Sequence, residues 1–481
     1  MTKDLAAPNY LVRGDEEIDD NPLLAHLPLP PDTDKEAFLA LALKPAFDEK
    51  DRALSNSIRR LRIKRVRRFY VPTSRVHRQA LIDIATNVID GYIARNPMTA
   101  VGQSRLYGNT EDLAFRPTIS LIAGHSGMGK STLIGRILDY MGKQLHQHAA
   151  FKGTPFPETQ ILYLRRNCPE HCTVGTLCST FGDYTDRVLG LQLYKGVFAK
   201  LQGGARNQYL SEIAKIIRTH HVGFLVIDEF QNLSLMGVGA KKIIALLVNL
   251  RDELGLPIVV VGTYKALRLL EGDMSTGRRL VEGGYFDLER PASAKDNSWI
   301  ELCELAWRYQ WVRDPIEFSS EICEALYDVS QGISGIMISA FSFAQLAAIE
   351  DGTERVDAAL IRKVYVERMK PLHPALRVLQ SGDPIMMDKF DDLYRNLWPK
   401  QEQEDGGSAS SSSLAPDGDA AKASSDDEHP ASTEPTKPKQ GKKRAPETPA
   451  APMAPRLSED QIKKMVLLDS VGDLLALLDK Q

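Results

Sequence analysis

The feature that most constrains the fold is a glycine-rich run at residues 124–131. It reads Gly-His-Ser-Gly-Met-Gly-Lys-Ser and matches the pattern G-x-x-x-x-G-K-[ST]. An apolar run at 119–123 precedes it and suits a buried strand, and residues 132–138 follow with apolar side chains at helical spacing. A glycine-rich turn between a strand and a helix directs successive backbone N–H groups at one point, beside the positive end of the helix dipole. The sequence therefore predicts an α/β fold that holds a polyphosphate at this turn.

Each residue of this run, with the threonine that follows it, has an expected place around a bound nucleotide. Lys130 should reach the β- and γ-phosphates, and the Ser131 hydroxyl should ligate Mg²⁺. The residues expected around the nucleotide are Gly124, His125, Ser126, Gly127, Met128, Gly129, Lys130, Ser131 and Thr132. The alternative is a chance match, but the strand and helix patterns on either side are the context that this motif requires.

A second apolar run, at 223–229, ends in two acidic residues, Asp228 and Glu229. Asp228, at the carboxyl end of a strand, can hold Mg²⁺ through water beside Ser131. Glu229 can orient and polarise the water that attacks the γ-phosphate. A buried strand that ends in two acids is common, but its position downstream of the glycine-rich run gives it meaning. We expect it to form the second half of the nucleotide site.

Two later positions could complete a hydrolytic site. The strand expected at 257–262 ends at Thr263, which could touch the γ-phosphate or the attacking water, or could simply cap the next helix. Arg278 and Arg279 are expected on a loop before a short strand at 285–288. One of them could reach the γ-phosphate of a neighbouring subunit as an arginine finger, or the two could be a surface pair. The further elements expected are a strand at 160–164 and helices at 79–95, 207–218 and 240–254.

Composition restricts the compartment. Five cysteines in 481 residues do not make a disulfide framework, which favours a reducing cytoplasm. The N-terminus lacks the layout of a signal peptide, and no run of 18 apolar residues exists, so no membrane is expected as a partner. The cluster Cys168, His171, Cys172 and Cys178 fits no common zinc spacing, and we expect ordinary thiols there.

Residues 59–78 form a basic segment, with nine Arg or Lys and no acidic residue. Lys and Arg side chains neutralise nucleic-acid phosphates and release counterions, so this segment favours contact with DNA or RNA. The alternatives are a solvated helix face and a contact with an acidic surface of another subunit.

Changes in composition divide the chain into six parts. Residues 1–58 are a polar N-terminal extension whose apolar patch, 21–28, is either a docking arm or a loosely packed extension. The parts that follow are a basic and helical segment at 59–108, a nucleotide-binding core at 109–292, an all-helical lid at 293–385, a largely disordered linker at 386–455 and a C-terminal segment at 456–481. The last segment is apolar and follows a long linker, so it is either a partner-binding peptide or a helix that folds back on the core.

Several of these runs together resemble the AAA+ class of ATPases, and more narrowly the TnsC/TniB-type regulators of bacterial DNA transposition. The similarity extends over roughly residues 18–385. Beyond the glycine-rich run, the matching segments are 20–22, 91–97, 225–234, 261–266, 278–279, 330–332 and 370–374. The most selective of them read Gly-Tyr-Ile-Ala-Arg-Asn-Pro, Asp-Glu-Phe-Gln-Asn-Leu and Lys-Pro-Leu-His-Pro.

The resemblance implies an AAA+ P-loop core with a parallel sheet and a helical lid, with ATP and Mg²⁺ as cofactors. In that family, ATP-bound subunits assemble as rings or filaments on double-stranded DNA, respond to a target-selector protein or RNA-guided complex, and recruit the transposase. The resemblance assigns nucleotide and Mg²⁺ binding to Lys130 and Ser131, and hydrolysis to Asp228 and Glu229. It assigns the role of sensor to Thr263 and that of the arginine finger to Arg278 or Arg279. One departure is the lid turn at 332–335, which lacks the arginine of a Gly-x-x-Arg pattern.

The function predicted from the sequence is thus an ATP-dependent regulator of transposition that oligomerises on target DNA and disassembles on hydrolysis. Its DNA contacts should be mainly to phosphates. The candidate residues are Arg65, Arg67, Arg68, Lys195, Lys200 and Arg206. Two alternatives remain: another AAA+ remodeller, such as a clamp-loader-like or helicase-loader-like ATPase, and a P-loop signalling switch that does not bind DNA.

Overall fold

The computed structural model of the chain describes residues 8–106, 117–170, 172–201, 206–233, 238–270, 274–388 and 390. His171, the side chain of Arg206, nearly all of the predicted linker and the whole predicted C-terminal segment lie outside these residues.

A five-stranded parallel sheet, with the order β6-β7-β8-β1-β9, forms the centre of the fold. Its strands are β1 (Ile119–Gly124), β6 (Tyr163–Asn167), β7 (Phe224–Asp228), β8 (Ile258–Gly262) and β9 (Tyr285–Leu288). Every residue of β1, β7 and β8 is buried, as expected of apolar strands that are covered on both faces. The strand expected at 160–164 divides at Leu162, and only β6 belongs to this sheet.

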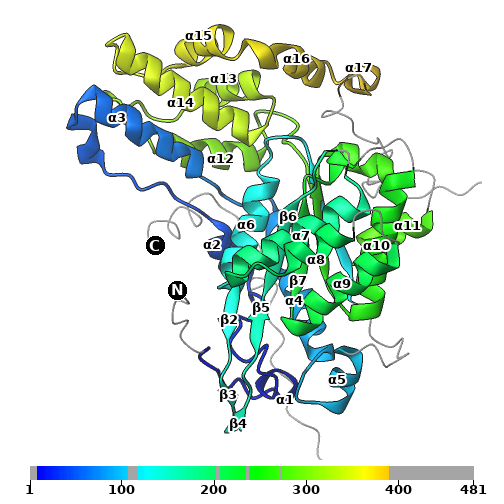
Figure 1. Cartoon of the computed structure of the whole chain (residues 1–481). Helices are drawn as coiled ribbons and strands as arrows, with labels where there is room; N and C mark the ends of the chain where they lie inside the picture. Colours follow the sequence, from blue (N-terminus) through cyan, green and yellow to red (C-terminus); the bar gives the residue numbers. More distant parts are fainter. Residues whose placement is uncertain are drawn as a thin grey trace, which may run out of the picture. The chain divides into compact units, whose positions relative to one another are not determined.

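Helices cover both faces of the sheet (Figure 1). Side chains alternate along the strands, so Val226 and Val259 join one apolar cluster with α4 (Arg75–Ala94) and α6 (Lys130–Met141). Leu225 and Val260 join the other cluster. The helices that contribute to this second cluster include α7 (Val174–Leu189), α8 (Tyr194–Lys200), α9 (Arg206–Thr219), α10 (Val238–Leu254) and α11 (Met274–Val281).

Short strands follow α6 as two antiparallel pairs. One pair is β2 (Leu145–Gln147) with β5 (Thr159–Ile161), and the other is β3 (Ala150–Phe151) with β4 (Thr154–Pro155).

The N-terminal extension docks on the chain's own core. It contains α1 (Glu16–Asp19) and α2 (Asp34–Leu41), while α5 (Ala100–Leu106) follows α4. Leu23 and Leu24 are buried in the cluster that lies around α4 and α6. Asn21 donates through Nδ2 to the carbonyl of Tyr92 at 2.9 Å, and Gln160 donates through Nε2 to that of Leu23 at 3.0 Å. The patch at 21–28 is therefore a docking arm, and its partner is this chain.

The region after the sheet is all-helical in its described residues, as the sequence predicts. Its helices are α12 (Asn297–Trp307), α13 (Ser320–Ser330), α14 (Ser334–Glu350), α15 (Ala358–Arg368), α16 (His373–Ser381) and α17 (Pro384–Asp388), with the 3₁₀-helix η5 (Lys370–Leu372). Among the described helices none is by itself long and apolar enough to cross a membrane. The pair α13 and α14, bent by 116° at the break between them, would be long and apolar enough together, by length and composition only.

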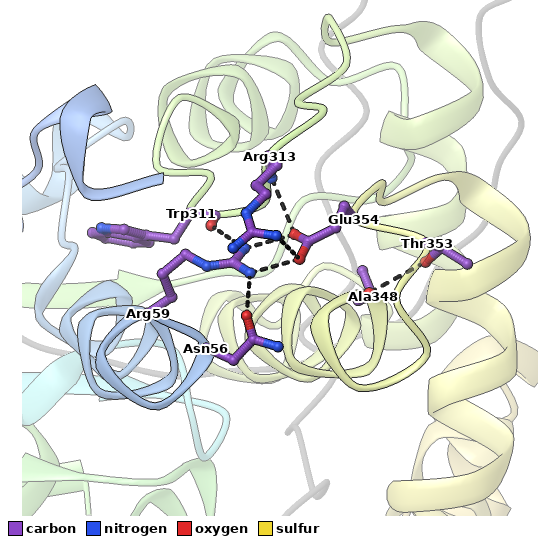
Figure 2. A network of polar contacts seen from close by, with 7 residues as sticks. All are labelled: Asn56, Arg59, Trp311, Arg313, Ala348, Thr353 and Glu354. Atoms are coloured by element: carbon purple, nitrogen blue, oxygen red, sulfur yellow. Dashed lines mark hydrogen bonds and ion pairs between the residues drawn. The ribbon is translucent and has the colours of Figure 1, made fainter. Parts of the chain in front are cut away.

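Part of the basic segment is fixed to this helical region instead of being exposed. The segment forms α3 (Asn56–Ile63) and η2 (Lys64–Arg68), preceded by η1 (Glu49–Ala53). The Arg59 side chain is fully buried and bonds both carboxylate oxygens of Glu354, each at 2.6 Å (Figure 2). It also donates to the carbonyl of Trp311 at 3.0 Å and to Asn56 Oδ1 at 2.7 Å. We call Asn56, Arg59, Trp311, Arg313 and Glu354 the Arg59 network.

The structure corrects one local prediction. Arg278 and Arg279 lie on helix α11, not on a loop. Leu280 anchors this helix because its side chain is buried in the core, and the buried Arg251 pairs with Glu282 at 2.7 Å just beyond the helix. Arg251 also donates to the carbonyl of Arg279 at 3.4 Å, near the end of the helix where carbonyls lack partners.

Candidate nucleotide-binding site

A cavity of about 750 Å³ lies at the carboxyl edge of the sheet. Because β1, β7, β8 and β9 are parallel, the residues that follow them meet at this one edge. Residues Ser126–Thr132 follow β1, Glu229 and Gln231 follow β7, Thr263 follows β8 and Glu289 follows β9, and all of them line the cavity. The remaining walls come from the basic segment and its continuation and from the helical region, at α12 and α14.

The glycine-rich turn has the conformation that its glycines allow. Gly127 and Gly129 have φ of +87° and +83°, a region that disfavours other residues, and α6 starts directly afterwards at Lys130. A Cβ on Gly129 would lie 3.0 Å from the ring of Tyr70. Lys130 donates through Nζ to the carbonyls of Gly124 and His125, at 3.0 and 2.8 Å. The carbonyls of Gly124 and His125 thus fix the Lys130 ammonium group, although these two residues do not line the cavity themselves.

The two acids differ in their surroundings. The Asp228 side chain is buried, and its Oδ2 accepts from Arg165 of β6 at 2.7 Å. The same Arg165 nitrogen donates to the carbonyl of Ser131 at 3.2 Å, so one guanidinium joins the two predicted Mg²⁺ ligands. Glu229 lines the cavity with φ of +57°, a strained value for a residue other than glycine.

Thr263 lines the cavity, and its side chain does not cap a helix. Its Oγ1 is buried and has no hydrogen-bond partner among the described residues. Its backbone N–H donates to Gln231 Oε1 at 3.0 Å, and Gln231 in turn donates to Glu229. An unpaired buried hydroxyl costs free energy, so its presence at a cavity wall fits a polar ligand.

A family model described as "AAA domain" matches residues 113–270. This range includes the glycine-rich turn, both acids and Thr263. The chain has an AAA+ P-loop fold. Its sheet, its helical C-terminal region and the site at the carboxyl edge of the strands confirm the fold class that the sequence predicts.

Solved structures similar to this chain share little sequence with it. The Orc1 protein of Aeropyrum pernix in complex with DNA is 16% identical, with a TM-score of 0.37, over 55% of this chain and 64% of that one. The RuvB Holliday junction branch migration motor of Thermotoga maritima is 14% identical, with a TM-score of 0.32, over 60% and 72%. Drosophila ORC bound to DNA is 14% identical, with a TM-score of 0.33, over 64% and 77%. No curated protein matches the chain.

In this AAA+ fold, the helical region touches the P-loop through its backbone. Gly335 donates its N–H to the carbonyl of Gly127 at 2.9 Å, and the Ser334 hydroxyl donates to the same oxygen at 3.1 Å. A Cβ on Gly335 would lie 2.9 Å from that oxygen, closer than Cβ atoms approach. The turn that lacks the Gly-x-x-Arg arginine therefore makes a direct contact with the P-loop. Nearby, Arg290 donates to the carbonyls of Gln331 and Leu379, each at 3.1 Å.

Sequence reasoning missed the contribution of the basic segment and the residues after it to this cavity. Arg67, Tyr70 and His77 line it. Burial raises the pKa of Tyr70, whose hydroxyl has no partner among the described residues, and burial lowers the pKa of His77 to about 4. Arg165 was missed too. The available signal was a pair of arginines at the end of a strand, which is unusual for a strand in a covered sheet.

The remaining predicted residues lie away from the cavity. Arg278 has 66% of its side chain exposed and pairs with Glu282 at 3.6 Å, whereas Arg279 is half-buried. Neither lines the cavity.

The DNA candidates whose side chains the structure describes lie on two elements, η2 and α8. Arg65 donates to the carbonyl of Ala46 at 3.0 Å, and Arg68 and Lys200 are exposed. Lys195 pairs with Asp183 at 3.4 Å. Cys168, Cys172 and Cys178 are buried free thiols.

Proposed function

We propose that this chain binds ATP with Mg²⁺ in the cavity and hydrolyses it. The observation that carries the proposal is the meeting of Lys130, Glu229 and Thr263, from separate elements, around one cavity. Lys130 would neutralise the phosphates, and Glu229 would polarise the attacking water. The unpartnered Thr263 hydroxyl would donate to the γ-phosphate.

The residues present suit Mg²⁺. Ser131 and Asp228 offer hydroxyl and carboxylate oxygens, the ligand types that Mg²⁺ takes in nucleotide sites. The Arg165 guanidinium joins the two residues through the Ser131 carbonyl and Asp228 Oδ2. The bound ion would neutralise charge on the β- and γ-phosphates.

The finger arginine would act between subunits. Arg278 and Arg279 lie outside the cavity of their own chain, which supports a role at the site of a neighbour. Of the two, Arg278 is the better candidate because its side chain is exposed and its described ion pair, with Glu282, lies at the surface, where an ion pair is weak. ATP would then stabilise an assembly of subunits, and hydrolysis would weaken it.

We further propose that ATP-bound subunits assemble on double-stranded DNA, as a ring or a filament, and regulate transposition by linking a target selector to the transposase. The support is the sequence resemblance over roughly 18–385 and the exposed basic side chains of η2, among them Lys64 and Arg68. Arg65, Lys195, Lys200 and Arg206 remain candidates for phosphate contacts. Arg67 lines the cavity, a position that suits contact with the nucleotide as well.

Steady-state hydrolysis tests the ATPase proposal. The wild-type chain with ATP and Mg²⁺ should release phosphate, and Lys130→Ala should lose ATP binding and turnover together. Glu229→Gln should keep ATP binding but lower kcat by about 100-fold or more, because general-base catalysis supplies roughly that factor. A wild-type chain that binds no ATP would contradict the proposal.

Electron microscopy tests the assembly. We expect rings or filaments on duplex DNA with a non-hydrolysable ATP analogue, but not with ADP, without nucleotide or with Lys130→Ala. Particles that stay monodisperse and off DNA in every nucleotide state at low salt would overturn the transposition proposal and favour a signalling switch. Capture of a protein ring without DNA coating would favour a clamp-loader-like or helicase-loader-like ATPase.

A further inference from the structure

The Gln231 side chain connects two parts of the candidate site. It lies two residues after Glu229, in the 3₁₀-helix η3 (Phe230–Asn232), and lines the cavity. Its amide is bonded at both ends: Nε2 donates to Glu229 Oε2, and Oε1 accepts from the backbone N–H of Thr263 at 3.0 Å. One side chain therefore joins the carboxylate that would polarise water to the strand end that would contact the γ-phosphate.

Other contacts hold the backbone of this turn. Phe230 is buried in the core, and Asn232 donates through Nδ2 to the carbonyl of Cys168 at 2.9 Å. Cys168 in turn donates its N–H to the carbonyl of Asp228 at 2.7 Å. Glu229, with its left-handed φ, is thus fixed from both sides without Gln231. What the Gln231 amide determines is the direction of the Glu229 carboxylate.

That direction matters for the chemistry. A carboxylate activates a water only within hydrogen-bond reach, and a misplacement of about 1 Å can cost roughly 100-fold in rate. A donor on Oε2 of Glu229 leaves Oε1 with both lone pairs for the water. We infer that Gln231 is a positioning residue for hydrolysis, which aims the Glu229 carboxylate and ties it to Thr263. This inference rests on the proposed ATPase function.

The bonding pattern requires both ends of an amide. Leucine at this position has neither a donor nor an acceptor. Glutamate keeps the length and the acceptor for the Thr263 N–H, but it places a second carboxylate against Glu229 where a donor stood. Asparagine keeps both groups on a side chain that is shorter by one methylene. These three substitutions separate loss of the donor from loss of the side chain.

The test combines ATPase kinetics with the affinity for a non-hydrolysable ATP analogue, measured by calorimetry. In Gln231→Leu and Gln231→Glu we expect kcat to fall about 10- to 100-fold, while the Kd of the analogue stays within about twofold of wild type. The kcat of Gln231→Asn should lie between those of the other two Gln231 variants and that of wild type. The control is Gln79→Leu, because Gln79 donates to the Asp83 carboxylate at 2.7 Å on the exposed face of α4; its kcat should equal that of wild type.

The outcomes separate the inference from the proposal beneath it. If Glu229→Gln abolishes turnover but the Gln231 variants keep wild-type kcat, the inference is wrong and the ATPase proposal stands. A parallel loss of kcat and analogue affinity also overturns it, because the amide would then serve nucleotide binding. A wild-type chain without ATPase activity overturns both. Should the leucine or glutamate variant not fold, Gln231→Asn decides, and wild-type kcat there refutes the inference.

Discussion

Replacing Arg59 with alanine should release helix α3 from the helical region. The Arg59 network is the buried polar contact that the described residues make between the two, beside an exposed ion pair of Arg60 with Glu350 at 3.9 Å. Glu354, its acceptor, lies between α14 and α15 (Figure 2). The side chain of Arg59 is 0% exposed and that of Glu354 is 16% exposed, so water screens the pair only weakly. Alanine would leave the carboxylate without its bidentate partner and would also unpair the Trp311 carbonyl.

The size of the effect follows from this geometry. Removal of one partner of a buried ion pair costs about 3–5 kcal/mol. Arg313 remains 3.9 Å from Glu354, and Glu354 is partly exposed, so the lower end of that range applies. We therefore expect the free energy for local opening of α3 to be about 3 kcal/mol lower in Arg59→Ala than in wild type. This corresponds to roughly a 100-fold larger population of the open state.

Hydrogen exchange followed by mass spectrometry measures this opening locally. Peptides that cover Asn56–Ile63 should exchange roughly 100-fold faster in Arg59→Ala, whereas peptides from β1 and β7 should not change. The control is Arg313→Ala, which removes an exposed arginine from the same carboxylate and should cost less than about 1 kcal/mol.

Equal exchange in Arg59→Ala and Arg313→Ala would refute the reasoning and would assign the attachment to apolar packing by Ile63 and Val66. A second check uses pH. The hydrogen bond from Arg59 lowers the pKa of Glu354 below its ordinary 4.5. The stability that this provides is present above pH 4.5 and is lost as the pH falls through the folded-state pKa. Wild type should therefore approach Arg59→Ala under acidic conditions.

Three further predictions follow from the structure. Gly335→Ala should push the helical region off the Gly127 carbonyl and weaken binding of an ATP analogue by about 10-fold in calorimetry; unchanged affinity would contradict a role for that contact. Burial, with nearby histidines, lowers the pKa of His26 to about 3. Below pH 6.5 the unfolded chain therefore takes up a proton that the folded chain does not, and the free energy of unfolding decreases by up to about 1.4 kcal/mol per pH unit; above pH 6.5 this loss is absent. His26→Gln should make the free energy of unfolding, measured by denaturation, depend less on pH below 6.5; an unchanged slope would contradict the role of His26. Arg278→Ala should abolish hydrolysis but not ATP binding, and mixing it with Lys130→Ala should restore activity; no recovery on mixing would argue against a finger in trans.

Local sequence predicts the parts of the site whose chemistry is local. The P-loop needs glycines at positions of positive φ, a lysine at the start of a helix and a strand before it, all within residues 119–138. The strand that ends in Asp228 and Glu229 can be read in the same way, because a buried parallel strand is an uninterrupted apolar run.

Contacts between distant segments could not be read from the sequence. Arg165 meets Asp228 because β6 and β7 are neighbours in register, which depends on strand order. Arg67 and Tyr70 reach the cavity because the segment before the sheet packs against the P-loop. Helix α11 has only eight residues, and contacts of Leu280 with the core and of Arg251 with the Arg279 carbonyl hold it in place.

The motif at 91–97 shows both sides of this division. The sequence shows that this run is selective for the family it resembles, but it does not show what the residues of the run contact. In the fold, Arg95 is buried and donates to the carbonyls of Gly91, Val222 and Gly223, which fastens the end of α4 to the start of β7. Similarly, Gly91 is required because a Cβ there would lie 2.7 Å from Pro257.

The sequence by itself determined the AAA+ class, the phosphate-binding turn and the two acids, because each depends on residues adjacent in the chain. The tertiary structure alone decided which basic residues are structural, as Arg59 is, and which face the cavity, as Arg67 does. It also decided that one amide, that of Gln231, joins Glu229 to Thr263. The reason is physical: a side chain's partner depends on which strands and helices pack together, and the residues of one segment do not specify that packing.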